Sequence, residues 1–137
     1  MKKIFSKIYP NRLLHILVKP LDLKKNINEI TDHSKLLQCI GLKLQKGKKF
    51  DSHKHKKIFQ LRMTSRTQES WCVIRGAASV FFYDIDGSFL CKQKLTSGCA
   101  SFTFEGGHSY EILSNNTLIY EYKNGPYKKI NDKHYFK

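Results

Sequence analysis

Arginine is scarce in this sequence, although the chain is strongly basic. Lysine and arginine together number 25 against 11 acidic residues, which gives a formal net charge of +14. The arginines among them are Arg12, Arg62, Arg66 and Arg75. Arginine is the side chain that clamps phosphate through two hydrogen bonds and reads guanine edges, so its scarcity argues against nucleic acid as a partner. The positive charge would still attract an anionic small molecule, such as a nucleotide-linked sugar.

The chain also lacks a hydrophobic run of membrane-spanning length. Its apolar N-terminal stretch, "LLHILV" at 13–18, is too short for the hydrophobic region of a signal peptide and is bounded by Arg12 and Pro20. The cysteines are Cys39, Cys72, Cys91 and Cys99. No CxxC pair is present, and most of these cysteines lie in apolar, strand-like runs, as is typical of reduced thiols in the cytosol. We therefore expect a soluble cytoplasmic protein with no membrane partner.

Helical periodicity and internal repeats are absent, and short strand-like runs dominate. A chain of 137 residues with 40% hydrophobic and 12% aromatic residues is typical of one globular domain. Runs rich in β-branched and aromatic residues occupy 13–18, 36–44, 57–63, 70–76, 78–84, 88–95, 99–104, 108–113 and 117–123. Turn signals separate most of them, which predicts an all-β sandwich or barrel. Segment 21–35 is expected to be a loop with a helical turn, and Gly41 to form a bulge.

Aromatic side chains in these runs are predicted to form the core rather than a platform for substrate, although one or two usually line such a pocket. They are Trp71, Phe81, Phe82, Phe102, Phe104 and Tyr110. Two charged side chains of the same runs, Arg75 and Glu121, could also project inward.

Two histidines stand one residue apart inside a lysine run, "GKKFDSHKHKKIF" at 47–59. In a strand, His53 and His55 would share one face and Lys54 would take the other. Glu69 and His108 each open a later strand-like run, whereas His15 and His33 are isolated. Two or three imidazoles with one carboxylate suit a divalent transition metal such as iron, manganese, nickel, zinc or copper. The alternative interpretation is that the pair belongs to an ordinary basic surface strand.

The spacing around these residues resembles the two sequence motifs of the cupin family. Gly47 is followed by five residues and then His53-Lys54-His55, and Glu69 is followed by six residues and then Gly76. Thirteen residues, 56–68, separate the two halves, where the family usually has three or four. The second motif is represented by Gly98, Phe104, Gly106 and His108. There Phe104 replaces the usual proline, and the gap before His108 is one residue short.

This resemblance covers roughly residues 36–123 and implies a cupin double-stranded β-helix, a small jelly roll. It implies a single domain, 1–137, with extensions at 1–35 and 124–137. The metal ligands that it implies are His53, His55, Glu69 and His108. The motif glycines would lie at turns that need positive φ or close backbone approach. By analogy with cupins that pair through an edge strand, the segment 13–18 could form a homodimer.

Three functions remain open for such a fold. The favoured one is a metal-binding cupin, with iron, manganese, nickel or zinc, that acts on or binds a carbohydrate or sugar nucleotide. The run "HKHKK" also resembles the cupin ketoisomerases that act on dTDP-4-keto-6-deoxysugars without metal. In that case His53 or His55 would be the acid–base catalyst, assisted by Tyr110 or Tyr83. The third is a non-catalytic module for a small ligand, so whether the protein is an enzyme stays open.

The stretches "QESWCVIRG", "GGHSYEIL" and "YEYKNGPY" are further similar to small uncharacterised cupins of surface-polysaccharide and sugar-nucleotide pathways. This similarity implies an anionic or carbohydrate ligand and a role in polysaccharide biosynthesis.

Overall fold

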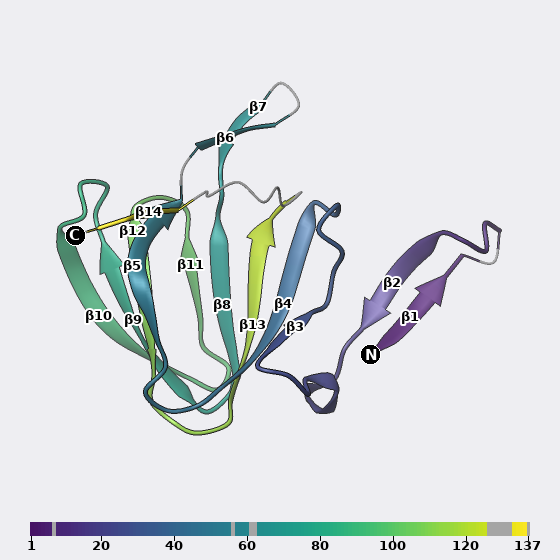
Figure 1. The fold of residues 1–137 in the computed structure, drawn as a ribbon, viewed down its shortest axis with the longest axis horizontal. Helices are drawn as coiled ribbons and strands as arrows, with labels where there is room; N and C mark the ends of the chain where they lie inside the picture. The colour runs from purple at the N-terminus through teal and green to yellow at the C-terminus, as the bar shows by residue number, and fades with distance from the viewer. Residues whose placement is uncertain (7, 56, 61–62, 126–132, 137) are drawn as a thin grey trace.

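Two five-stranded antiparallel sheets pack face to face in the computed structural model, which describes residues 1–6, 8–55, 57–60, 63–125 and 133–136 (Figure 1). The first sheet has the order β10 (Phe89–Thr96), β9 (Ala77–Tyr83), β12 (Gly107–Ile112), β5 (Lys49–His55) and β14 (Lys133–Tyr135). The second has the order β11 (Ala100–Thr103), β8 (Glu69–Arg75), β13 (Thr117–Asn124), β4 (Leu37–Leu44) and β3 (Ile27–Glu29). From β4 onward the described part of the chain alternates between the two sheets, and β9 and β10 are the only consecutive strands of the main sheets that remain in the same sheet over that stretch. The all-β jelly roll expected from the sequence is therefore confirmed.

The core between the sheets follows from the two-residue alternation of the strands. In β8, Glu69, Trp71 and Val73 are buried, and the residues between them are only partly covered. The buried apolar cluster comprises Leu42, Leu44, Trp71, Val73, Ala78, Val80, Leu95, Tyr110, Ile112 and Ile119. At the other ends of β5, β8, β12 and β13 the inward positions carry polar side chains, and the candidate site lies there.

The aromatic residues predicted for the core divide between the two faces of the sheets. Trp71 and Tyr110 are buried, and Phe82 packs against the cluster. Phe102 and Phe104, however, are each 61% exposed. They alternate along the chain with the buried Ser101 and Thr103, so the prediction was wrong for these two phenylalanines because their register turns them outward.

Gly41 does not form the predicted bulge. The β4 strand pairs with β13 from Leu37 to Leu44 without a shift of register. A Cβ atom at Gly41 would overlap the side chain of Leu23, so this position is small because Leu23 packs over it. Leu23 follows a short 3-10 helix, η1 (Pro20–Asp22), at the start of the segment 21–35 that was expected to be a loop with a helical turn, and belongs to a second apolar cluster. The same segment also contains strand β3 (Ile27–Glu29), which was not predicted.

Two hairpins lie outside the main sheets. β1 (Lys2–Phe5) and β2 (Leu13–Leu17) form a two-stranded sheet that stands to the side of the barrel in Figure 1. β6 (Lys57–Gln60) and β7 (Met63–Arg66) form another, within the insertion between the two halves of the first motif. The single strand predicted at 57–63 was wrong, because the chain reverses after Gln60; residues 61–62 themselves lie outside the described residues.

The motif glycines have the backbone conformation that the resemblance implied. Gly47, Gly76, Gly98 and Gly106 all have φ between 76° and 88°. At Gly106 a Cβ atom would also come within 2.5 Å of the Tyr83 carbonyl oxygen. Glycine is needed at that turn for both reasons.

Candidate metal centre

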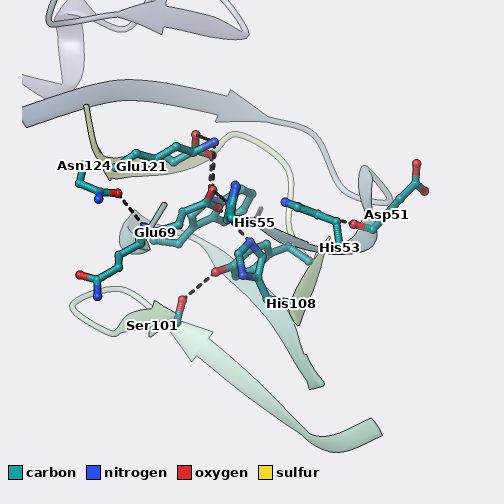
Figure 2. Close-up of polar contacts among 12 residues, drawn as sticks. Asp51, His53, His55, Glu69, Ser101, His108, Glu121 and Asn124 are labelled. Carbon is teal, nitrogen blue, oxygen red and sulfur yellow. Dashed lines mark hydrogen bonds and ion pairs between the residues drawn. The ribbon is translucent and has the colours of Figure 1, made fainter. Parts of the chain in front are cut away.

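Four polar side chains from three strands meet at one end of the barrel interior. His53 and His55 lie on β5, His108 on β12 and Glu69 at the start of β8. His108 is the direct cross-strand partner of His53, and Glu69 enters from the opposite sheet. Figure 2 shows the four side chains converging. All are buried, with exposed fractions between 0% and 5%.

The neighbouring lysine points away from this cluster, as the alternation predicts. Lys54 donates through Nζ to the Ile85 carbonyl oxygen at 2.7 Å and lies over the ring of Phe136. The two histidines therefore face the barrel interior, whereas the lysine between them lies on the opposite face of β5. The interpretation of the pair as part of a surface strand is thus wrong.

The distances between the four side chains are short. His55 Nε2 lies 3.1 Å from Glu69 Oε2, and His108 Nε2 lies 3.2 Å from Glu69 Oε1. The His53 ring centroid is 4.7 Å from that of His108 and 5.2 Å from that of His55. The Glu69 carboxylate thus bridges two of the three imidazoles. The thirteen-residue insertion does not displace Glu69, because the β6–β7 hairpin accommodates the additional residues.

The hydrogen bonds of the imidazoles leave nitrogen atoms available inside the cluster. His53 Nδ1 lies 2.8 Å from the Asp51 carbonyl oxygen, which can only accept, so Nδ1 carries the proton and Nε2 keeps its lone pair. Within the described residues, His53 Nε2 and both ring nitrogens of His108 are buried without a hydrogen bond. His108 Nε2 is within ion-pair distance of Glu69, but the two groups are not aligned as a hydrogen bond. Buried polar atoms without partners are costly, and a bound ion would satisfy them.

The cluster also fits a metal ion by size. One ligand atom from each of the four residues lies within 4.8 Å of every other. Ligands on opposite sides of an ion with bonds of about 2.1 Å are about 4.2 Å apart, so side-chain shifts of a few tenths of an ångström would complete a site. Three nitrogens and one carboxylate oxygen are a donor set that divalent transition metals accept.

Burial controls the charge of these groups in the metal-free protein. Desolvation lowers the pKa of His53 to about 4, although the bond to the Asp51 carbonyl partly opposes this. Burial alone would raise the pKa of Glu69, but His108, His55 and Lys123 outweigh it and hold that pKa well below its usual range. The site thus presents a neutral His53 beside an ionised carboxylate at neutral pH, which is the protonation state that metal binding requires.

Two further charged residues that the sequence analysis did not place in the site lie behind Glu69. Lys123 Nζ is 2.9 Å from Glu69 Oε2 and 3.1 Å from Glu121 Oε1. Trp71 Nε1 donates to Glu121 Oε2 at 2.9 Å. Glu121 projects inward as predicted, and Lys123, two residues further along β13, has the same direction. Arg75, by contrast, is exposed and donates to the Asn116 carbonyl oxygen, so its predicted inward direction was wrong.

The tyrosines proposed as helpers lie on different faces of the sheet. Tyr110 is buried beneath the cluster, stacked on Trp71 at 3.8 Å, and its hydroxyl is 3.0 Å from Ser101 Oγ. Burial raises the pKa of Tyr110, and its catalytic role stays a prediction. Tyr83 is on the outer side of β9, where its hydroxyl is 3.3 Å from Ser109 Oγ. Because His108 and Ser109 point to opposite faces, Tyr83 does not join the cluster.

The remaining histidines named in the sequence analysis are remote from this centre. His15 lies on the N-terminal hairpin, and His33 is paired with Glu29 at 3.3 Å. A residue that the sequence analysis did not identify, Tyr135, lies beside His53 instead, with ring centroids 5.8 Å apart. Tyr135 belongs to β14, which pairs with the edge of β5. The aperiodic tail offered no sequence signal for that pairing.

A cavity of about 400 Å³ borders the carboxylate end of the cluster. Glu69, Thr103 and Lys123 line it together with Phe102 and Phe104. Thr103 lies directly opposite Glu69 in the sheet, and its buried hydroxyl has no hydrogen-bond partner among the described residues. Of the four candidate ligands, Glu69 lines this cavity and the three histidines do not, so a small ligand bound there would border the carboxylate end of the cluster.

Comparison with known proteins is informative at the level of structure. No family model matches the chain, and no curated protein matches its sequence significantly. Among solved structures, KdgF from Halomonas sp. superposes with a TM-score of 0.56 at 20% identity, over 78% of this chain and 86% of that one. A cupin-2 domain protein from Shewanella frigidimarina gives 0.51 at 15% identity, over 72% and 79%. The chain has a cupin fold.

Oxalate decarboxylase from Bacillus subtilis, which contains Mn(II) centres, superposes with a TM-score of 0.57 at 19% identity. The match covers 75% of this chain but only 25% of the decarboxylase chain. At these identities the comparison establishes the cupin fold alone. In the part of the chain that the structure describes, no helix has the length and hydrophobicity needed to cross a membrane.

Proposed function

We propose that this cupin binds one divalent transition metal ion through His53, His55, Glu69 and His108. The observation that carries the proposal is the convergence of four buried side chains, with ring nitrogens of His53 and His108 that have no hydrogen-bond partner among the described residues. Iron, manganese, nickel and zinc all accept this donor set. The Mn(II) centres of a decarboxylase with the same fold make manganese a candidate.

We also propose that the ligand of the site is a small carbohydrate or sugar nucleotide, as in surface-polysaccharide biosynthesis. The cavity beside Glu69 presents the Thr103 hydroxyl and the Lys123 ammonium, and the net charge of +14 favours an anionic molecule. A bound metal would supply Lewis acidity toward an oxygen atom of that ligand. The residues of the chain would then orient the ligand and exclude water from the buried end.

A second candidate function is metal-independent proton transfer. Its support is His53 itself, because desolvation keeps the imidazole neutral and Nε2 is unpaired and directed into the cluster. A neutral imidazole in that position can accept a proton from carbon next to a carbonyl group. His55 and Tyr110 would assist in this case. The role of a non-catalytic binding module differs from both in predicting ligand binding without turnover.

Metal content measured by mass spectrometry decides between the two candidates. The protein would be purified without chelator or histidine tag, beside His53→Ala/His55→Ala and a control, His15→Ala/His33→Ala, which removes two remote histidines. We expect near-stoichiometric metal in the wild type and the control and none in the first variant. A metal-free wild type, even after incubation with iron, manganese, nickel and zinc, would overturn the metal proposal. The acid–base candidate would then be tested with nucleotide-linked ketosugars.

We further propose that two copies associate through the N-terminal hairpin. Every residue of β1 is exposed, and apolar side chains that include Ile4, Phe5, Leu14 and Leu17 remain uncovered on this hairpin. A two-stranded ribbon is marginally stable in water without further packing. Light scattering should give a mass twice that of the 16.0 kDa chain. Leu14→Lys/Leu17→Lys should give the monomer mass, and a monomeric wild type would contradict the proposal.

We also propose that the protein is cytoplasmic, and the state of its cysteines supports this. All four lie in the described part of the chain and are free thiols. Burial raises the pKa of the Cys39 thiol to about 11, which keeps it protonated and unreactive. Reduced, unpaired cysteines of this kind are typical of proteins in a reducing compartment.

A further inference from the structure

Behind the four candidate ligands, a chain of three contacts connects Glu69 to the barrel core. The Lys123 ammonium lies between two carboxylates, 2.9 Å from Glu69 Oε2 and 3.1 Å from Glu121 Oε1. Trp71, which is 1% exposed, donates its indole N–H to the other oxygen of Glu121. Both Glu121 and Lys123 come from β13, and Lys123 is the direct cross-strand partner of Glu69.

These contacts determine which part of Glu69 remains available. Oε2 receives the ammonium and also lies 3.1 Å from His55 Nε2, whereas Oε1 faces His108 at 3.2 Å. A cation in contact with a carboxylate competes directly with any metal for its negative charge, and more strongly inside a protein than in water. Lys123 alone would therefore neutralise Glu69 and weaken a metal site. Glu121 changes this, because it offers the same ammonium a second carboxylate.

The charges can be counted for the described side chains. Burial and the Glu69 charge raise the pKa of Glu121, whereas Lys123 and Trp71 oppose that rise. With both carboxyls ionised, two carboxylates and one ammonium leave one net negative charge beside three imidazoles. Without Glu121 the group would be neutral, and without Lys123 it would carry two negative charges. Without both, it would again carry one. If the group acts on the ion through its charge, metal affinity should rise with its negative charge. It should be lowest without Glu121, highest without Lys123, and similar in the wild type and without both.

We propose that Glu121 and Lys123 set the charge of the metal centre: the Lys123 ammonium neutralises part of the negative charge of Glu69, and Glu121 offsets enough of the ammonium charge to keep Glu69 a ligand. This inference rests on the proposed metal site. It predicts a sign for each substitution. If these ion pairs only stabilised the fold, the substitutions would change the folding stability. They would not produce this order of metal affinities.

The test is a double-mutant cycle of Glu121→Gln, Lys123→Met and the combined variant, with Lys94→Met as a control. Lys94 is exposed on β10, so its loss changes the net charge of the protein equally but not the charge of the site. Metal affinity would be measured by competition with a chromophoric chelator. Thermal unfolding of each metal-free protein would be recorded in parallel to separate folding defects from binding defects.

Glu121→Gln should weaken metal binding about tenfold or more, the usual effect of losing an outer partner of a ligand. Lys123→Met should bind metal more tightly than the wild type although its metal-free form unfolds at lower temperature, and the double variant should return close to the wild-type affinity. The control, Lys94→Met, should have the same metal affinity as the wild type. Unchanged affinity in Glu121→Gln, or a double variant as weak as that single one, would overturn the inference.

Two other outcomes are also decisive. If the wild type binds no metal, the metal proposal fails and this inference fails with it, whereas a metal-binding wild type with the wrong order of variants overturns this inference alone. If Glu121→Gln does not fold, the comparison of Lys123→Met with the double variant remains. Tighter binding by Lys123→Met supports the inference, and equal binding contradicts it.

Discussion

The metal-free protein should lose stability between pH 8 and pH 5 because of His53. Its pKa is lowered to about 4 by burial, whereas an unfolded histidine titrates near 6.5. Below pH 6.5 the unfolded chain therefore binds a proton that the folded chain excludes, and the free energy of unfolding falls as the pH falls toward 4. Above that window both states hold a neutral ring and His53 has no effect on the pH dependence.

The size of the effect follows from the two pKa values. Linkage between about 6.5 and about 4 gives a loss of about 2 kcal/mol at pH 5. With an allowance for screening by water, we expect about 1–2 kcal/mol. The carboxyl of Glu69 has the opposite shift in pKa, so its contribution is complete at higher pH and is lost mainly below its ordinary value of 4.5. The window above pH 5 therefore excludes most of the contribution of Glu69.

Urea unfolding at pH 8 and pH 5, after removal of metal with a chelator, measures this loss. His53→Gln should reduce the loss by about 1–2 kcal/mol. The other imidazoles of the cluster are present in both proteins, so their contributions cancel. The control is His15→Gln, whose exposed ring on β2 gives no reason for a change. A His53→Gln protein that loses as much stability as the wild type would refute the assignment of a desolvated, neutral His53.

Other consequences of the structure can be tested by simple substitutions. A metal present at 100 times its dissociation constant should stabilise the wild type by about 2.7 kcal/mol, and Glu69→Gln should show a smaller rise in unfolding temperature in a thermal-shift assay. Gly106→Ala should cost about 2–3 kcal/mol in urea unfolding, because its φ is +76° and a Cβ would press on a β9 carbonyl. Gly47→Ala should cost only about 1 kcal/mol, since its φ is similar but no atom lies within 4 Å of the added group; equal costs would contradict the role of the close contact. Tyr110→Phe should cost about 1 kcal/mol by leaving the buried Ser101 hydroxyl unpaired, with metal content unchanged; a loss of metal would show that Tyr110 does more than support the cluster.

Local patterns in the sequence were sufficient for much of the fold and half of the site. Strand runs separated by turns predicted an all-β sandwich or barrel, because the period of two and the turn chemistry depend on residues close together in the chain. The jelly roll itself was implied by the resemblance to the cupin family. The same period placed His53 and His55 on one face and Lys54 on the other. Four positive-φ turns followed from glycine positions in motifs that resemble the cupin family. Family resemblance, rather than periodicity, indicated that Glu69 and His108 join the two histidines.

Cross-strand register decided the parts of the fold and of the candidate site that the sequence did not predict. No local sequence pattern encodes this register. Register made His108 the neighbour of His53, brought Glu69 back across a thirteen-residue insertion, and turned Phe102 and Phe104 outward although their run looked like core. It also brought Lys123 opposite Glu69, where a lysine at a strand end would ordinarily be solvated. Strand composition sets which faces are buried, but the pairing of strands distant in sequence is fixed by the collective packing of both sheets. For that reason the sequence alone brought out the four candidate ligands, and only the tertiary structure revealed the charged residues that contact one of them.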